Sequence, residues 1–388
     1  MNQQLLNTMF DLIKFDLFGE VNFNDDTKEY INNNIKTIYA LSKRHDIAHI
    51  IADAVEKLGI ELSDENVAAK LKRLLFVSVV RYERINHELV RVCDAFENNG
   101  IYHMPLKGVI LRKLYPKPWL RTSCDIDILV NESDVEKAMK LLSDMGYGEG
   151  KKTGHDVSMV SEGGVNVELH YKLVEDGRVN STNEVLKKVW DYSTVTEGKK
   201  FCLEMQKEMV YFYHIAHMAK HFEVGGCGIK PFIDQLIMKR TGYYKVGEEN
   251  ELLMKGGLLK FEGKVCQICS IWFENMEHSD ITRRMQKYLI NGGTYGNIGN
   301  HTSVESFKKG GKLKYILCLI WLPYDALCLK YPSLKNKKWL YPFYQVRRWI
   351  GVVPKLKKHI LIFKTINSKK NDELDSMGTF FNDIGLDL

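Results

Sequence analysis

The segment "RTSCDIDILV" (121–130) places Asp125 and Asp127 one residue apart in a run of isoleucine, leucine and valine. On a β-strand, residues i and i+2 share a face and lie about 6.6 Å apart. The two carboxylates therefore point the same way and repel each other, while Ile126 and Ile128 point into a core. A divalent cation, or two cations about 3.5–4 Å apart, would compensate this repulsion. Mg²⁺ prefers oxygen ligands and commonly shares them with substrate phosphates.

A third carboxylate occurs later, on another alternating segment. The stretch "VNVELHYKL" (165–173) alternates apolar and polar residues, and its polar face carries Asn166, Glu168 and His170. If this strand neighbours the aspartate strand, three carboxylates converge. Two of them could then coordinate metal, while the third also takes a proton from an attacking hydroxyl. The aspartate pair alone is more typical of a solvated strand face than of a metal site, so Glu168 is what favours a metal site.

Two segments carry a family resemblance. "PLKGVILRKLYPKPWLRTSCDIDILV" (105–130) resembles a segment of the uncharacterised nucleotidyltransferase family, part of the DNA polymerase β-like nucleotidyltransferase superfamily. "HIAHMAKHFEVGGCGIKPFIDQLI" (214–237) is similar to a second segment of the same family. The superfamily pattern is a Gly-containing turn at a helix start, a D-x-D strand and a later strand with a third acid. All three occur here in order, and the resemblance spans roughly residues 30–300.

The resemblance implies transfer of a nucleoside monophosphate from a nucleoside triphosphate to an acceptor hydroxyl, with pyrophosphate leaving. Mg²⁺ or Mn²⁺ would be the cofactor. The backbone beside Gly108 can face a phosphate at a helix start, and Lys107 would add a point charge. The residues implied as catalytic and metal-binding are Asp125, Asp127 and Glu168. Those implied to bind the nucleotide are Lys107, Gly108, Arg121, His217, His221, Lys230 and Asp234.

Hydrophobic periodicity predicts the elements that position these residues. Helical spacing dominates 1–100 and returns from about 204 to 290, whereas 101–106 and 124–130 are predicted strands. Residues 156–160 and 165–173 form a predicted hairpin, and Ser133 with Glu136 a capping box that opens a helix. The Gly-rich segment 292–300 is a predicted loop. We expect a helical region (1–100), a nucleotidyltransferase core (101–195), a helical region completing the nucleotide cleft (196–300) and a basic, aromatic-rich tail (301–388).

The predicted fold class is therefore α+β. A small mixed sheet with helices, polymerase β-like by resemblance, is flanked by N- and C-terminal helical regions. Apolar content of 45% and charged content of 27% are typical of a soluble globular protein. No apolar run approaches the roughly 20 residues needed to span a bilayer. The first 20 residues are expected to form a helix and not a signal peptide. Eight scattered cysteines predict reduced thiols and a cytoplasmic location.

Charge is distributed unevenly along the chain. Residues 308–370 hold 16 Lys/Arg and one acid, whereas 371–388 hold five acids and no Lys/Arg. With +6 for the whole chain, the first 307 residues carry a net charge of −4. Basic residues among tryptophans and tyrosines fit a peripheral position on an anionic membrane, here the inner membrane face. The same composition fits single-stranded nucleic acid, or simply a terminal helical subdomain with a charged surface.

Two other groups of residues have the spacing of metal ligands. His214, His217 and His221 share a helical face and could bind zinc, but core packing or a place in the nucleotide pocket is favoured. Cys266 and Cys269 form a lone C-x-x-C, which predicts two core-facing thiols. The alternatives to nucleotidyl transfer are a phosphotransferase that uses the same metal site, or a catalytically silent scaffold that binds membrane or RNA through its tail. The acceptor, whether protein, RNA, sugar or small molecule, is not specified by the sequence.

Overall fold

The computed structural model describes residues 2–173, 180–245, 250–294, 296–352, 356–368 and 371–387. The chain forms two compact units. The first comprises Met1–Met218 and Ile229–Thr282, and the second comprises Ala219–Gly228 and Arg283–Leu388. Within the described ranges, no helix is both long enough and apolar enough to cross a membrane.

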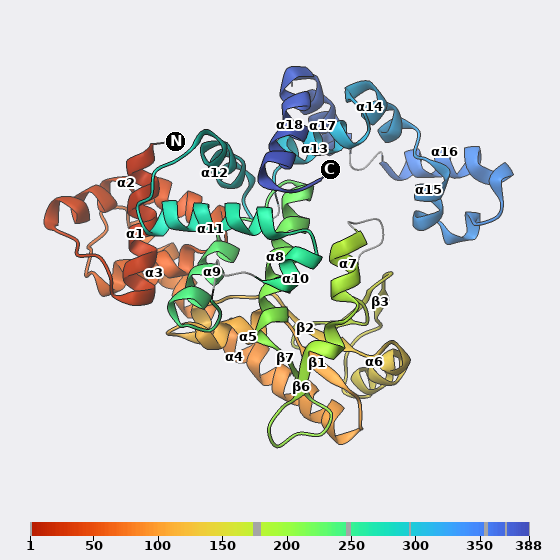
Figure 1. The fold of residues 1–388 in the computed structure, drawn as a ribbon, viewed down its shortest axis with the longest axis horizontal. Coiled ribbons are helices and arrows are strands. Elements are labelled where there is room, and N and C mark those ends of the chain that lie inside the picture. Colours follow the sequence, from red (N-terminus) through yellow and green to blue (C-terminus); the bar gives the residue numbers. More distant parts are fainter. Residues whose placement is uncertain are drawn as a thin grey trace. The chain divides into compact units, whose positions relative to one another are not determined.

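The first unit contains a five-stranded mixed sheet (Figure 1). Its strand order is β1-β2-β5-β4-β3. Strands β2 and β5 are parallel, and every other neighbouring pair is antiparallel. The predicted hairpin is present as β4 and β5. A separate two-stranded sheet pairs β6 with β7. The strands are β1 (His103–Pro105), β2 (Asp125–Val130), β3 (Lys151–Lys152), β4 (Asp156–Val160), β5 (Asn166–His170), β6 (Ser193–Val195) and β7 (Leu203–Met205).

A hydrophobic core covers one face of the five-stranded sheet. Ile126 and Ile128 of β2 are fully buried in it, as the alternation predicted. They pack with apolar side chains from α4 (Glu65–Asn98) and α6 (Val135–Asp144), which lie beside the sheet in Figure 1. Burying each isoleucine stabilises the fold by roughly 1.5–3 kcal/mol. A slip of one residue would bring Asp125 and Asp127 into this core, so the burial determines which face carries the acids.

Helices complete the first unit, and the N-terminal ones pack against helices from much later in the chain. Phe10 stacks on Trp272 with ring centroids 4.7 Å apart. The remaining helices are α1 (Gln3–Phe18), α2 (Asp25–Arg44), α3 (Ala48–Lys57), α5 (Gly108–Leu111), α7 (Asn180–Leu186), α8 (Lys207–Val224), α9 (Lys230–Arg240), α10 (Glu251–Lys255) and α11 (Leu259–Phe273). Short 3-10 turns span Arg112–Leu114, Pro118–Leu120, Glu132–Asp134 and Val189–Tyr192.

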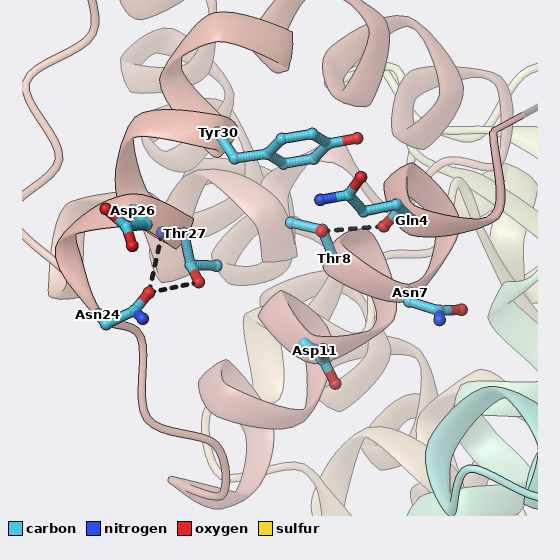
Figure 2. Close-up of a pocket in the computed structure, with 8 residues that line it drawn as sticks. All are labelled: Gln4, Asn7, Thr8, Asp11, Asn24, Asp26, Thr27 and Tyr30. Carbon is cyan, nitrogen blue, oxygen red and sulfur yellow. Dashed lines mark hydrogen bonds between the residues drawn. The ribbon is translucent and has the colours of Figure 1, made fainter.

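A polar hollow of about 580 Å³ lies between α1 and α2 (Figure 2). Its lining groups largely serve local structure. Asn24 accepts hydrogen bonds from the backbone and the hydroxyl of Thr27 at the start of α2, and the Thr8 hydroxyl donates to the Gln4 carbonyl. None of the predicted site residues lines this hollow.

Among its described residues, the second unit consists of helices joined by turns and loops and contains no strand. Tyr288 stacks on Phe222 and contacts Phe380 and Phe381, so the C-terminal helix closes a core of its own. The end of α8 belongs to this unit. The other helices are α12 (Asp280–Gly292), which begins in the first unit, and α13 (Ile298–Lys308), α14 (Lys312–Ile320), α15 (Tyr324–Lys330), α16 (Tyr341–Val352), α17 (Leu356–Ser368) and α18 (Asn371–Ile384). Two 3-10 turns span Pro332–Leu334 and Lys338–Leu340.

Two local predictions are wrong. The capping box is absent, because a 3-10 turn over Glu132–Asp134 leads directly into α6, and the N-cap residue Asp134 makes no side-chain cap bond. The predicted loop 292–300 is shorter than expected, because Asn297 caps α13 and makes the last three residues helical. Tyr295 in that loop lies outside the described residues. The glycines there allow close backbone packing, since a Cβ on Gly296 would lie 2.7 Å from the carbonyl carbon of Gly225.

Candidate active site

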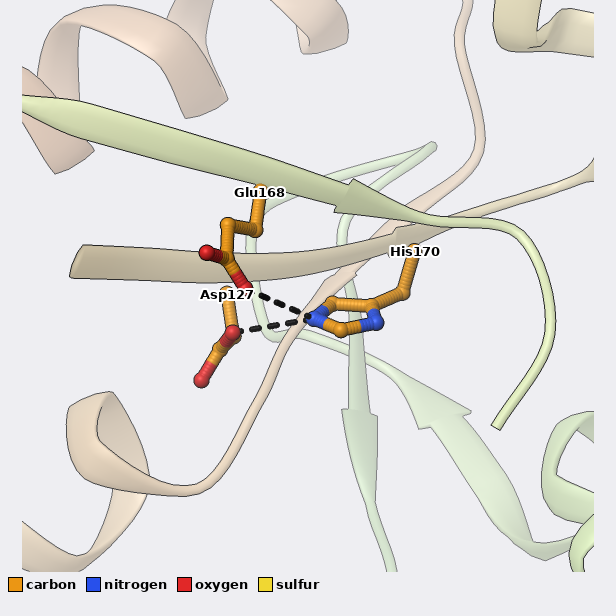
Figure 3. A group of neighbouring side chains, drawn as sticks. All are labelled: Asp127, Glu168 and His170. Carbon is orange, nitrogen blue, oxygen red and sulfur yellow. Dashed lines mark hydrogen bonds and ion pairs between the residues drawn. The ribbon is translucent and has the colours of Figure 1, made fainter. Parts of the chain in front are cut away.

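The acidic residues of β2 and β5 lie side by side on the sheet face opposite the core. In the parallel register, Asp127 pairs with Glu168 and Asp125 pairs with Asn166. The predicted neighbouring of the two strands is therefore confirmed. One ligand atom from each of Asp127, Glu168 and His170 lies within 4.8 Å of the other two. Figure 3 shows these three side chains converging from two strands.

His170 joins the candidate site in the structure, although the sequence did not predict it as a site residue. Its Nε2 lies 2.9 Å from Asp127 Oδ1 and 3.8 Å from Glu168 Oε2. The signal was present, because His170 follows Glu168 by two residues on the same strand face. A histidine bonded to a carboxylate in this way orients it, or binds a metal beside it.

Burial and mutual repulsion disfavour the ionised forms of these carboxyl groups, and a bound cation would offset both effects. Burial and the neighbouring charge of Asp127 raise the pKa of Asp125 and of Glu168. Burial acts in the same direction on Asp127, but the bond with His170 and the charge of Lys107 outweigh it and lower its pKa to about 2. Asp127 is therefore firmly ionised, while two carboxyl groups beside it resist ionisation. A bound dication reverses such resistance.

The donor set fits a divalent metal. Asp125, Asp127 and Glu168 offer carboxylate oxygens, which suit Mg²⁺ and Mn²⁺, and His170 offers a nitrogen. Asp125 is outside the three-residue cluster but shares its strand face, so it is placed to contribute from one side.

Lys107 supplies positive charge next to the acids. Its Nζ lies 3.2 Å from His217 Nδ1 and 4.7 Å from the centre of the Tyr213 ring, both on α8. Burial acts to lower the pKa of Lys107, but Tyr213, Asp127 and Asp125 outweigh burial and raise it. Lys107 also has a φ of 34°, a conformation that side chains rarely adopt. Backbone strain of this kind is typical of functional sites, where surrounding contacts maintain it.

Gly108 begins α5, which has only four residues. The Val109 and Ile110 N–H groups already donate within this turn, to the carbonyls of Leu106 and Lys107. A Cβ on Gly108 would lie 3.8 Å from Arg121 Nη1 and 3.6 Å from Ser123 Cβ. Gly108 and Arg121 are therefore neighbours, as expected of two groups that would share a phosphate.

A buried ion pair holds Arg121. Its Nε donates to Asp234 Oδ1 at 2.7 Å, and the Tyr115 hydroxyl donates to the same oxygen at 2.7 Å. The charge of Arg121 helps to lower the pKa of Asp127, so the guanidinium acts on the acidic site. Asp234 is 1% exposed, and in this arrangement it orients Arg121.

The remaining predicted nucleotide-binding residues are Lys230, His217 and His221, and each has different surroundings. Lys230 donates to Asp46 and to the hydroxyl and carbonyl oxygens of Thr122, directly after Arg121. His217 lies beside Lys107, as described above. His221 belongs to the second unit, and its role stays a prediction.

A cavity of about 430 Å³ lies at the C-terminal ends of β2 and β5. Leu129 lines it and shares the strand face of Asp127, while Lys172 lies two residues beyond His170. Lys107 and Gly108 follow β1, on the other side of β2 from β5. The residues that line the cavity thus lie mostly on the β5 side, and the Lys107–Gly108 turn lies on the β1 side. Its other lining residues are Glu132, Tyr171, Leu173, Leu186, Lys187, Val189 and Trp190.

Neither alternative metal motif forms a site. The His214 ring bonds the Pro231 carbonyl at 3.1 Å, and His217 faces Lys107. Cys269 is buried, and Cys266 contacts Glu262, as predicted for thiols in a helical core. Within the described ranges, Asp127, Glu168 and His170 are the one group with metal-ligand spacing.

Two buried histidines bond backbone carbonyls near the two members of the Arg121–Asp234 ion pair. His49 Nε2 bonds the Leu120 carbonyl at 2.8 Å, and His214 bonds Pro231. Burial lowers the pKa of each histidine to about 4. An unfolded histidine titrates near 6.5, so between these values the unfolded chain binds more protons. Each histidine thus gives a contribution to stability that is complete above about pH 6.5 and is lost as the pH falls towards 4.

We expect His49→Gln to reveal this contribution. The wild-type advantage in free energy of unfolding over the variant should shrink by about 2–3 kcal/mol between pH 7.5 and 4.5, because only the wild type must exclude a proton. Urea denaturation at both pH values measures it. The comparison with the variant is needed because burial raises the pKa of Asp16 to about 7. This shift makes the free energy of unfolding increase as the pH falls, in the wild type and the variant alike, and it cancels in the difference between them. An advantage independent of pH would contradict the prediction.

Comparison with known proteins agrees with this geometry. The model of a family described as "Uncharacterised nucleotidyltransferase" matches residues 32–274, which is more than half of the chain. The match includes both strands of acids, the Lys107–Gly108 turn and α9. No curated protein matches the chain. The α+β fold, with a small mixed sheet among helices, is that expected of such enzymes. The chain belongs to the uncharacterised nucleotidyltransferase family.

Proposed function

We propose that the protein transfers a nucleoside monophosphate from a nucleoside triphosphate to an acceptor hydroxyl, with release of pyrophosphate. The observation that carries this proposal is the register of Asp127 with Glu168 on neighbouring parallel strands. Membership of a nucleotidyltransferase family supports transfer from a nucleoside triphosphate. The cofactor would be Mg²⁺ or Mn²⁺, held by Asp125, Asp127 and Glu168 and supplying charge neutralisation for the reacting oxygens.

Each side chain of the site has a separate proposed role. Glu168, whose pKa burial and nearby acids raise, takes the proton from the acceptor hydroxyl. The acceptor oxygen forms a bond to the α-phosphorus, and the bond from that phosphorus to the pyrophosphate oxygen breaks. Lys107 and Arg121 neutralise the phosphate charge, and positioning by these fixed groups lowers the barrier. Gly108 leaves room for the phosphate, His217 orients Lys107, and Lys230 and Asp234 hold the segment around Arg121. A nucleotide-binding role for His221 rests on the family resemblance alone.

The acceptor is proposed to enter through the cavity at the ends of β2 and β5. Trp190 and Tyr171 line it together with leucines, so it suits an acceptor with a flat apolar group next to the reacting hydroxyl. The two lysines of its rim are already paired, Lys172 with Glu132 and Lys187 with Glu184, so they give little net attraction for an anion.

Calorimetry with ATP, CTP, GTP and UTP tests the metal site. We expect at least one triphosphate to bind at least about tenfold more tightly with Mg²⁺ or Mn²⁺ than with a chelator, because the metal joins the phosphates to the acids. Equal affinity with and without metal would contradict the proposed site.

Incubation of labelled triphosphates with a cell lysate tests the transfer itself. The product mass should correspond to addition of a nucleoside monophosphate. Addition of phosphate alone would indicate a phosphotransferase, and absence of triphosphate binding would favour a catalytically silent scaffold. Trp190→Ala separates the acceptor cavity from the chemistry, since it should reduce labelling while leaving triphosphate and metal binding unchanged.

The proposal places the protein in the cytoplasm, in keeping with its eight free thiols. It includes a peripheral contact of residues 308–370 with an anionic membrane.

A further inference from the structure

Two helices of the second unit carry apolar side chains on their solvent-facing sides. On α14, Leu313, Leu317 and Ile320 are exposed and fall at i, i+4 and i+7. On α16, Phe343, Val346 and Ile350 are exposed at i, i+3 and i+7. Each set forms a single stripe along its helix, which in a water-soluble domain normally faces the core.

The polar side of α16 faces inward instead. Gln345 is 0% exposed and donates to the Leu322 carbonyl. The buried Arg348 donates to the carbonyls of Leu319 and Ile320, at the C-terminal end of α14. These bonds satisfy carbonyl groups that a helix end leaves without partners. Polar contacts thus hold α16 to the end of α14 and leave its apolar side outward.

Exposure of this kind is concentrated in one part of the chain. Among the described residues, twelve of the 23 exposed large apolar side chains fall between Leu313 and Leu361. The most exposed of these include Leu329 and Trp339. The surrounding segment, 308–370, holds 16 Lys/Arg against one acid. Residues 353–355 and 369–370 of it lie outside the described residues. Apolar stripes and tryptophans within a cationic segment match the chemistry of an anionic bilayer surface.

Two other partners fit less well. Single-stranded nucleic acid is bound by stacking bases on aromatic rings, yet the α14 stripe and most of the α16 stripe are aliphatic. Arg347 already lies over the rings of Tyr331 and Tyr344, at 5.3 and 5.8 Å. A second copy of the chain would bring a second segment of net charge +15 against the first. Only an anionic surface neutralises this charge and buries the stripes together.

We infer that α14 and α16 rest in the surface layer of an anionic membrane, with their apolar stripes inserted between the lipid headgroups. The contact is peripheral and does not cross the bilayer. It rests on the peripheral membrane contact proposed above, for which it names the contacting helices, and it is independent of the proposed catalytic activity.

Flotation of the full-length protein with lipid vesicles tests this inference. The probes are vesicles of phosphatidylcholine alone and vesicles that also contain phosphatidylglycerol. The wild type should float with the anionic vesicles, and binding should weaken at high salt. The double variant Phe343→Ser/Ile350→Ser should bind at least about tenfold more weakly, because two apolar side chains no longer insert. Phe76→Ser is the matched control, since Phe76 on α4 is 71% exposed against 68% for Phe343, and its binding should match the wild type.

Three results would overturn the inference: no flotation of the wild type with anionic vesicles, equal flotation of the double variant, or equal loss in the Phe76→Ser control. Tight binding of poly(U) without vesicle binding would point to RNA, and a lipid-free dimer broken by the double variant would point to self-association. If the double variant does not fold, quenching of tryptophan fluorescence by brominated lipids provides the test. The contribution of Trp339 is the difference in quenching between the wild type and Trp339→Phe. Absence of Trp339 quenching rejects the bilayer contact.

Discussion

Replacement of Asp127 by asparagine is expected to lower the rate of nucleoside monophosphate transfer at least about 10³-fold, because a metal ligand contributes several kcal/mol of charge stabilisation in the transition state. Asp127 is the acid that lies next to the other candidate site residues. It is paired in register with Glu168, bonded to His170 and kept ionised with a pKa of about 2. Its amide isostere keeps the shape of the side chain and removes the charge.

The fold of this variant should persist. Asp127 lies on the sheet face opposite the core, and loss of its charge removes repulsion with Asp125 and Glu168. Transfer of labelled nucleotide and the urea midpoint are measured on the same preparation. Glu136→Gln is the control, because Glu136 is an exposed acid of the same unit whose ion pair is with Lys152, and its rate should stay within about twofold. A rate for Asp127→Asn within tenfold of the wild type would remove the proposed mechanism.

Asp234→Ala is expected to destabilise the protein by about 3–5 kcal/mol, the usual cost of removing one partner from a buried ion pair. Asp234 is 1% exposed, and one of its oxygens accepts from both Arg121 and Tyr115. Without it, the Arg121 guanidinium is left buried without its counter-charge. A guanidinium group is not deprotonated in proteins, so Arg121 cannot relieve this cost by losing its proton.

Urea denaturation measures this loss, and the double variant Arg121→Met/Asp234→Leu gives the internal check. It should recover much of the stability, since apolar residues of similar volume often replace a buried ion pair without cost. It should nevertheless lose triphosphate affinity, because Arg121 is absent. A loss below about 1 kcal/mol in Asp234→Ala would show that the pair does not hold this segment. Breaking the exposed ion pair of Glu136 and Lys152 should leave the urea midpoint nearly unchanged in the same assay.

The strands that carry the three acids were predictable, because alternation of apolar and polar residues is visible within a few consecutive positions of the sequence. Alternation of isoleucines with Asp125 and Asp127 determines which side chains share a face, and burial of Ile126 and Ile128 enforces it. The same period identifies Glu168 on its strand. Family resemblance carried by the two motif segments, 105–130 and 214–237, identified the fold. The predicted capping box is wrong because a 3-10 turn over residues 132–134 leads into α6, whose N-cap is Asp134 and not Ser133.

Tertiary structure decided what depends on contacts between distant residues. The placing of β5 beside β2 brings His170 to Asp127, 43 residues earlier, and the pairing of Arg121 with Asp234 joins residues 113 positions apart. The apolar spacing of α14 and α16 is readable in the sequence, but its outward direction is not. That direction follows from Gln345 and Arg348, which bind backbone carbonyls of residues 319–322. Sequence period shows that a helix has two faces, whereas only packing determines which of them meets the surroundings.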